Sequence, residues 1–324
     1  MAGEPETTGG AGPGGSPGEQ DEDAGLYERW VQESIRNPQR VYRGLFYVVT
    51  LFFLVTMMFP FYWLLVLALT PNDQIVDMGL LPRGFNVEAF VRIFELLPFG
   101  RYMFNSIFLA LVTTAIVLLL ASIAGYVFGR LEFPGRQPLM LLILAISYFP
   151  PAAFLLPLFD LFTGNVSIGL GPIAIQSPVL FNTPGAMILP FSSLFLPLAI
   201  FILTTFYGQI PDGLEDAARV EGTTRIGALF RVIMPLSAPG VATAGILTFI
   251  AVYNEFFFSF LMNDGQAQNW APIVWGILGF QGQYTQFYNL MAAASIVGVL
   301  PVVILVVIAQ EKIVSGLTAG ALKE

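Results

Sequence analysis

The sequence predicts an all-α membrane protein with six transmembrane helices, and three observations support this fold class. Hydrophobic residues make up 56% of the 324 positions and charged residues only 11%, whereas soluble domains carry about 25% charged residues. Several apolar stretches reach the roughly 20 residues that a helix needs to cross the hydrocarbon core of a bilayer. These stretches are continuously apolar and do not alternate with polar residues, which disfavours a transmembrane β-barrel.

Six apolar stretches define the expected transmembrane helices, which together with their loops form a membrane domain over residues 44–324. We expect these spans at residues 44–69, 104–129, 138–162, 186–207, 241–261 and 290–309. The third span carries Pro150, Pro151 and Pro157. Proline lacks a backbone N–H and clashes with the preceding helical turn, so we expect this span to be interrupted.

The basic residues predict the orientation of the chain in the membrane. Most of the 14 lysines and arginines lie in one alternating set of loops, and the other set holds only Arg83, Arg92 and Arg101. By the positive-inside rule, we expect a multi-pass protein of the cell (plasma or inner) membrane with both termini in the cytoplasm. Residues 1–25 are rich in glycine, proline and acids, which predicts a disordered cytoplasmic tail. Residues 26–43 form an amphipathic lead-in to the first span.

The composition also excludes several kinds of chemistry. The chain contains no cysteine and no histidine, so disulfides, thiolate chemistry and imidazole ligands or bases are absent. No G-x-x-x-x-G-K-[ST] stretch occurs, and the chain therefore lacks a phosphate-binding P-loop. The few acids do not cluster within the expected spans. We expect no catalytic residue, no bound cofactor, no metal site and no enzyme activity in this chain.

A charged stretch between the fourth and fifth spans predicts two short amphipathic helices on the cytoplasmic side. Asp212 precedes Glu215 by three residues, as in a capping box with aspartate as the N-cap. Gly222 suits the left-handed residue that ends a helix. Thr223 or Thr224 then caps a second helix. That helix carries an apolar stripe of Ile226, Leu229, Phe230 and Ile233.

Three interpretations of this helix pair are open from its pattern alone. It is an interfacial element whose arginines face lipid phosphates, a DNA-binding helix-turn-helix, or a docking element whose apolar ridge enters a groove on a soluble partner. The acids in the stretch and the spans on either side of it make the DNA-binding interpretation improbable. We expect the lipid bilayer and proteins, and no nucleic acid, as partners.

The sequence around Gly222 resembles the signature of a known family. DAARVEG at 216–222, followed by FRVIMPLSAPG, resembles the EAA motif of permeases of ATP-binding-cassette (ABC) importers. Asp216 stands where glutamate is usual, Glu221 where aspartate is usual and Thr223 where alanine is usual. These replacements keep charge or size approximately, and the glycine at the turn is retained.

Three further segments resemble the carbohydrate (maltose-type) branch of these permeases, in particular its six-span partner subunit. NSIFLALVTTAIVLLLASIAGYVFGRLEFPGR resembles the second span and its basic exit. YNEFFFSFLM resembles a W-N-E-F motif with Tyr253 in place of tryptophan, and GLTAGALK resembles the C-terminal motif. The resemblance covers about residues 41–324, and four motifs in the same order make it specific.

The resemblance implies a type I ABC importer permease fold, with residues 211–235 as coupling helices. It implies that the chain moves a sugar or oligosaccharide delivered by an extracytoplasmic sugar-binding protein. It also implies a heterodimer with a second permease subunit and two cytoplasmic ATPase subunits, which bind ATP and Mg²⁺. The residues expected to contact the ATPase are Glu215, Asp216, Ala217, Ala218 and Gly222.

The substrate pathway is less well marked. Glu255 lies in the fifth span beside Tyr253 and Asn254, and an ionisable group inside a span is costly and usually functional. We assign these three residues to the pathway, while a structural hydrogen bond explains Glu255 equally well. The aromatic residues here suit stacking on sugar rings or ordinary packing. The uncharged loop 164–185 resembles the one that probes the binding protein in this family, and also suits a passive connector.

Other functions compete with this interpretation. The first is an ABC permease for another small solute, such as a polyamine, phosphate, sulfate or an amino acid. The second is an ion-coupled secondary transporter, which predicts inverted repeats and midplane ion ligands. The third is a non-transporting membrane scaffold, which leaves the cytoplasmic helix pair unexplained.

Overall fold

The structure is a computed structural model that describes residues 38–170, 173–282 and 286–319. The expected acidic tail at 1–25, most of the lead-in at 26–43 and the end of the C-terminal motif lie outside these residues. The chain divides into two compact units, 1–62 and 63–324. We describe each unit by itself.

Helices form almost all of the regular structure. The long helices are α2 (Pro38–Leu69), α4 (Phe99–Arg130), α7 (Pro184–Tyr207), α11 (Ala238–Tyr253) and α14 (Tyr288–Ala319). The short helices are η1 (Asn72–Gln74), α3 (Ala89–Leu96), α5 (Arg136–Ser147), η2 (Pro151–Phe154), α6 (Leu155–Phe162), α8 (Asp212–Val220), α9 (Arg225–Ala228), η3 (Leu229–Ile233), α10 (Met234–Leu236), α12 (Phe257–Leu261), η4 (Ala267–Asn269) and α13 (Ile273–Leu278).

The described part of the first unit consists of residues 38–62, which belong to α2. Its apolar side chains are largely exposed, with Leu45, Phe52 and Met57 all more than half accessible. A soluble domain rarely exposes a continuous apolar surface of this kind. The helix therefore suits contact with lipid or with another membrane subunit.

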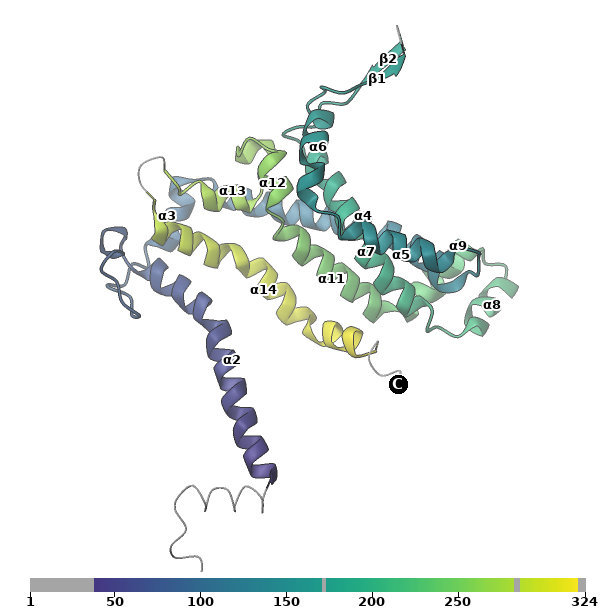
Figure 1. Ribbon diagram of the computed structural model, residues 1–324, viewed down its shortest axis with the longest axis horizontal. Helices are drawn as coiled ribbons and strands as arrows, with labels where there is room; N and C mark the ends of the chain where they lie inside the picture. Colours follow the sequence, from purple (N-terminus) through teal and green to yellow (C-terminus); the bar gives the residue numbers. More distant parts are fainter. Residues whose placement is uncertain (1–37, 171–172, 283–285, 320–324) are drawn as a thin grey trace, which may run out of the picture. The chain divides into compact units, whose positions relative to one another are not determined.

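The second unit has α4 near its centre. Helix α4 packs along α7 and α11, and α11 packs in turn on α14 (Figure 1). One buried cluster contains Phe99, Phe191 and Phe249 from α4, α7 and α11. A second cluster, which includes Leu203 and Leu229, joins α4 and α7 to the segment after α9. The helix pair between α7 and α11 is therefore connected to the helical core by side-chain packing.

Two glycines allow α4 and α7 to approach closely. A Cβ atom at Gly125 would lie 2.9 Å from the Cβ of Leu203, and one at Gly129 would lie 2.9 Å from the carbonyl oxygen of Thr204. Real Cβ atoms do not tolerate such distances, so both positions require glycine at this separation of the helices. Small residues at an interface are a common way to bring two membrane helices together.

Four helices are long and apolar enough to cross a membrane by themselves: Pro38–Leu69, Phe99–Arg130, Pro184–Tyr207 and Tyr288–Gln310. Two further pairs meet the same criteria but are bent, Arg136–Ser147 with Pro151–Phe162 by 83° and Arg225–Leu236 with Ala238–Tyr253 by 86°. The described chain thus contains four to six candidate spans. The first bend lies at Pro150 and Pro151, the interruption that the sequence predicted, because the residue before a proline avoids the helical conformation.

A small β-hairpin interrupts the all-helical fold in the described residues. Strands β1 (Ser167–Leu170) and β2 (Ile173–Gln176) pair antiparallel, with Ser167 opposite Gln176. The hairpin follows α6 (Figure 1) and lies inside the expected outer loop. The loop therefore contains a short β-sheet, whereas we predicted an all-α protein.

Candidate functional site: the helix pair between α7 and α11

The turn between α8 and α9 has the geometry that the sequence predicted. Gly222 has a φ angle of 91°, in the left-handed region. Its N–H donates to the carbonyl oxygen of Arg219 at 3.0 Å, and the N–H of Thr223 donates to that of Ala218 at 3.0 Å. These two hydrogen bonds make the Schellman motif that ends many helices. The predicted glycine stop is confirmed.

The helix starts differ in how well the sequence predicted them. Thr224 is the cap of α9, and its hydroxyl accepts a hydrogen bond from the N–H of Gly227 at 3.1 Å. At α8 the N-cap is Pro211, and no side chain caps the helix. The prediction that Asp212 is the cap is wrong, because its carboxylate instead forms an ion pair with Arg130 at 2.8 Å.

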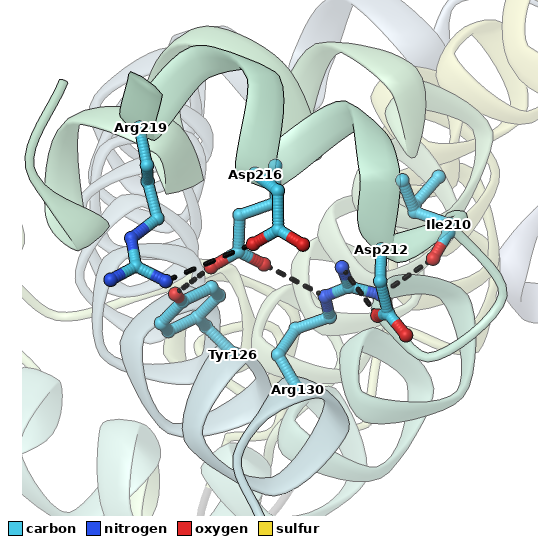
Figure 2. Close-up of polar contacts among 7 residues, drawn as sticks. Tyr126, Arg130, Ile210, Asp212, Asp216 and Arg219 are labelled. Atoms are coloured by element: carbon cyan, nitrogen blue, oxygen red, sulfur yellow. Dashed lines mark hydrogen bonds and ion pairs between the residues drawn. The ribbon is translucent and has the colours of Figure 1, made fainter. Parts of the chain in front are cut away.

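Arg130, the last residue of α4, contacts three groups around the start of α8 (Figure 2). Its Nε donates to Oε2 of Glu215 at 3.0 Å, and its Nη2 to Oδ1 of Asp212 at 2.8 Å. Its Nη1 donates to the carbonyl oxygen of Ile210 at 2.5 Å. The Arg130 side chain is only 4% exposed, so these groups replace the water that a guanidinium normally binds.

Tyr126 lies one turn before Arg130 and therefore on the same face of α4. Its hydroxyl donates to Oε1 of Glu215 at 2.5 Å (Figure 2). Both carboxylate oxygens of Glu215 are thus bound by α4 of the same chain, and the Glu215 side chain is 8% exposed. We expected Glu215 at an ATPase contact; in this structure its carboxylate is directed to the interior of its own subunit.

Sequence reasoning missed the roles of Tyr126 and Arg130. Their partner Glu215 lies 89 and 85 positions away along the chain, beyond the reach of any local pattern. The available signal was an arginine at the end of an apolar span, which we used only to predict orientation. A buried arginine requires a partner such as an acid, and the acids of α8 were among those predicted on the same side of the membrane.

The outer side of α8 differs from the side that contacts α4. Asp216 and Ala217 are exposed, and Ala218 is half-buried. The carboxylate of Asp216 lies 3.9 Å from the guanidinium of Arg219 (Figure 2), with both side chains accessible to solvent. Exposed ion pairs contribute little to stability. This side therefore presents exposed polar and small side chains to solvent.

An exposed apolar surface continues from the end of α8 onto the following segment. We call Val220, Ile226 and Phe230, which are 89%, 64% and 39% exposed, the outer apolar surface. The apolar stripe predicted for the second helix divides in two, because Leu229 and Ile233 are buried in the core. Its buried half anchors the segment, and its exposed half faces away from the core.

The residues assigned to the substrate pathway lie at a break between α11 and α12. Glu255 accepts hydrogen bonds from the first turn of α12. Its Oε1 binds the N–H groups of Phe257 and Phe258 at 2.8 and 3.0 Å, and its Oε2 binds the N–H and hydroxyl of Ser259 at 3.0 and 3.2 Å. A carboxylate suits the N-terminal end of a helix. These contacts give Glu255 a structural role at the start of α12, as in the alternative of a structural hydrogen bond.

The two residues beside Glu255 have different surroundings. Tyr253 is buried, its hydroxyl donates to the carbonyl oxygen of Gly298 in α14 at 2.7 Å, and its ring stacks on Phe249. Asn254 is exposed and donates to the carbonyl oxygen of Ile250 at 2.9 Å. The structure brings the three residues together, but only Asn254 presents an exposed side chain.

The described residues contain no group of three or more acidic, histidine or cysteine side chains placed to hold a metal ion. The arrangement is thus one of helix packing, an amphipathic helix pair and an internal ion-pair cluster. Long apolar helices of this kind define a polytopic membrane protein.

Comparison with known proteins identifies the family. Residues 118–318 match the family described as binding-protein-dependent transport system inner membrane component, and the chain belongs to it. The sulfoquinovosyl glycerol transport system permease protein SmoH of Agrobacterium fabrum is 37% identical over 83% of this chain and 90% of its own length. The trehalose transport system permease protein SugB of Mycobacterium tuberculosis is 36% identical over 82% and 92%. The trehalose/maltose transport system permease protein MalG of Thermococcus litoralis is 33% identical over 82% and 91%.

Solved structures show the same fold. A bacterial ABC transporter that imports the acidic polysaccharide alginate has a chain that superposes with a TM-score of 0.64 at 18% identity. The superposition covers 85% of this chain and 97% of that one. A second structure, the alginate transporter with a pentasaccharide-bound periplasmic protein, has a TM-score of 0.59.

Family membership decides between the competing functions. The chain is a permease subunit of an ABC transporter and not by itself an enzyme. The resemblance to sugar importer permeases is confirmed, and an ion-coupled secondary transporter and a non-transporting scaffold are excluded.

Proposed function

We propose that this chain translocates a sugar or oligosaccharide as one permease subunit of an ABC importer. The observation that carries this proposal is similarity over 82% to 83% of the chain to permeases named for sulfoquinovosyl glycerol, trehalose and maltose, at 33% to 37% identity. None of these relatives is named for a polyamine, phosphate, sulfate or amino acid. The alternative of another small solute therefore has no comparable support.

The chain crosses the membrane six times in this proposal: the bent pair α5–α6 contributes one span, α11 contributes another, and both termini lie in the cytoplasm. The distribution of basic residues supports this orientation. So does the burial of Arg130 against acids of α8, since it requires the end of α4 and the helix pair to lie on the same side of the membrane.

The helix pair α8–α9 couples the permease to an ATPase subunit. Asp216 and Ala217 on the exposed side of α8, together with the outer apolar surface, support docking into a groove on a soluble partner. Ala218 permits close approach, and Gly222 sets the angle between the helices. Glu215 contributes from the inner side, through its bonds to α4.

The remaining partners follow from the same proposal. A second permease subunit completes the pore, and two ATPase subunits bind ATP and Mg²⁺ in the cytoplasm. An extracytoplasmic binding protein delivers the sugar, and the hairpin β1–β2 in the outer loop suits contact with it. Asn254, the exposed residue at the break after α11, faces the substrate pathway, while Tyr253 and Glu255 shape the break.

Reconstitution of the complete transporter tests the substrate class. The permease heterodimer and its ATPase subunits are placed in proteoliposomes with candidate binding proteins, each loaded with one sugar. We expect ATP hydrolysis and uptake to rise with at least one loaded sugar-binding protein. Stimulation by a polyamine- or phosphate-loaded binding protein and by no sugar-loaded one would refute the proposal.

A further inference from the structure

Four side chains attach the cytoplasmic end of α4 to the start of α8, and we call them the α4–α8 clamp: Tyr126, Arg130, Asp212 and Glu215 (Figure 2). The two α4 residues are four positions apart and the two α8 residues are three apart. Each helix therefore presents its pair on one face. The result is a set of contacts between two helices that are distant in the sequence.

The strength of the clamp lies in its buried part. Arg130 and Glu215 are 4% and 8% exposed, and charges that are away from water attract each other more strongly and are screened less by salt. Hydrogen bonds to charged groups are also stronger than those between neutral groups. Asp212 is 89% exposed, so its ion pair adds little. Tyr126, Arg130 and Glu215 thus hold the two helices together.

The clamp is attached to a rigid support. Gly125 and Gly129, which immediately precede Tyr126 and Arg130 in α4, bring this helix against the backbone of α7. Arg130 also binds the carbonyl oxygen of Ile210 in the linker from α7 to α8. This linker consequently cannot swing freely relative to α4.

We propose that the clamp makes α8 move as one body with the cytoplasmic ends of α4 and α7. A force applied to α8 then reaches α4 directly, through the side chains of Arg130, Tyr126 and Glu215. Without the clamp, α8 would keep the linker from α7, the turn at Gly222 and its packing on α9 and η3, and would lose its direct side-chain bonds to α4. The three residues are positioning residues. The inference rests on the proposed docking of an ATPase at α8.

A pair of matched variants tests the clamp in the complete reconstituted transporter. Tyr126→Phe removes only the hydroxyl that binds Glu215. Tyr207→Phe removes a buried hydroxyl between α4 and α7 that does not contact α8. A hydrogen bond to a charged group corresponds to a change of roughly ten- to a hundredfold in an equilibrium. We expect Tyr126→Phe to lower the amount of sugar transported per ATP hydrolysed by roughly this factor, and Tyr207→Phe to leave the ratio unchanged.

A distance measurement tests the movement itself. The chain contains no cysteine, so the double variant Glu132→Cys/Gly213→Cys carries two spin labels, one just after α4 and one on α8. Both sites are exposed, and a Cβ at Gly213 has open space around it. We expect the same label distance with and without ATP in the complete complex. We also expect a broader distribution when Arg130→Lys is added.

The outcomes separate this inference from the proposed function. If wild-type complexes do not bind ATPase subunits or import sugar, the proposed function fails. If wild type imports sugar and Tyr126→Phe has the wild-type ratio, the clamp is overturned. It is also overturned if the label distance changes with nucleotide, or if the variant only lowers the amount of assembled complex at an unchanged ratio.

Discussion

Replacement of Gly222 by alanine is expected to impair transport although it removes no contact. The φ angle of 91° places this residue in the left-handed region, where a Cβ collides with the following carbonyl oxygen. Alanine therefore shifts the backbone at Gly222 toward another conformation. The angle between α8 and α9 changes with it, and the outer apolar surface no longer has one orientation.

The structure allows the size of this effect to be worked out. The left-handed conformation costs an L-residue about 1–2 kcal/mol. Apart from Gly222 and its two chain neighbours, no residue has an atom within 4 Å of a Cβ built at Gly222, so no clash with the rest of the fold adds to this value. An energy of this size corresponds to a factor of about 5–30 in the population of the intact turn. Asparagine, which tolerates the left-handed region better, is expected to have a smaller effect.

Gly213 is the matched control. A Cβ at Gly213 also meets open space, but its φ is not positive and it lies within α8. Alanine there is expected to stabilise the helix by about 0.5–1 kcal/mol and to leave transport intact. ATP-driven sugar uptake into proteoliposomes is measured for Gly222→Ala, Gly222→Asn and Gly213→Ala. Wild-type uptake by Gly222→Ala, or equal losses in all three variants, would refute the reasoning.

Three further predictions concern single side chains. Val220→Ser is expected to reduce co-purification of the ATPase subunits. The control is Val76→Ser, which changes a similarly exposed valine on the expected outer side and is expected to leave co-purification unchanged. Equal results for both variants would contradict docking at α8. Tyr253→Phe loses the hydrogen bond to Gly298 and is expected to destabilise the subunit by about 1 kcal/mol, seen as a lower melting temperature at an unchanged choice of sugar. Glu255→Gln puts an amide NH₂ group, a donor, where a carboxylate oxygen accepts hydrogen bonds from Ser259. The expected loss of folding stability is about 0.5–2 kcal/mol. An unaltered melting temperature would argue against a role of Glu255 in binding the first turn of α12.

Local chemistry accounts for the features that were predictable. Gly222 was recognised because a glycine that follows an amphipathic helix commonly ends it, and this depends on nearby residues alone. Pro150 and Pro151 predicted an interruption for the same reason. Asp212 was misplaced because α8 begins at Asp212 itself, after Pro211, and its carboxylate is directed to a partner that the fold supplies. That partner, Arg130, lies on another helix.

The sequence by itself determined that the chain is helical, belongs in a membrane and carries an amphipathic helix pair between two spans. Hydrophobic length, charge distribution and the preferences of glycine and proline are sufficient for these conclusions. Only the tertiary structure decided which side of α8 is available. Glu215 and Asp216 are neighbours of similar charge, yet one is bound by Tyr126 and Arg130 and the other is exposed. Successive residues of a helix point in different directions, and which direction meets α4 depends on the packing of helices that are far apart in the sequence.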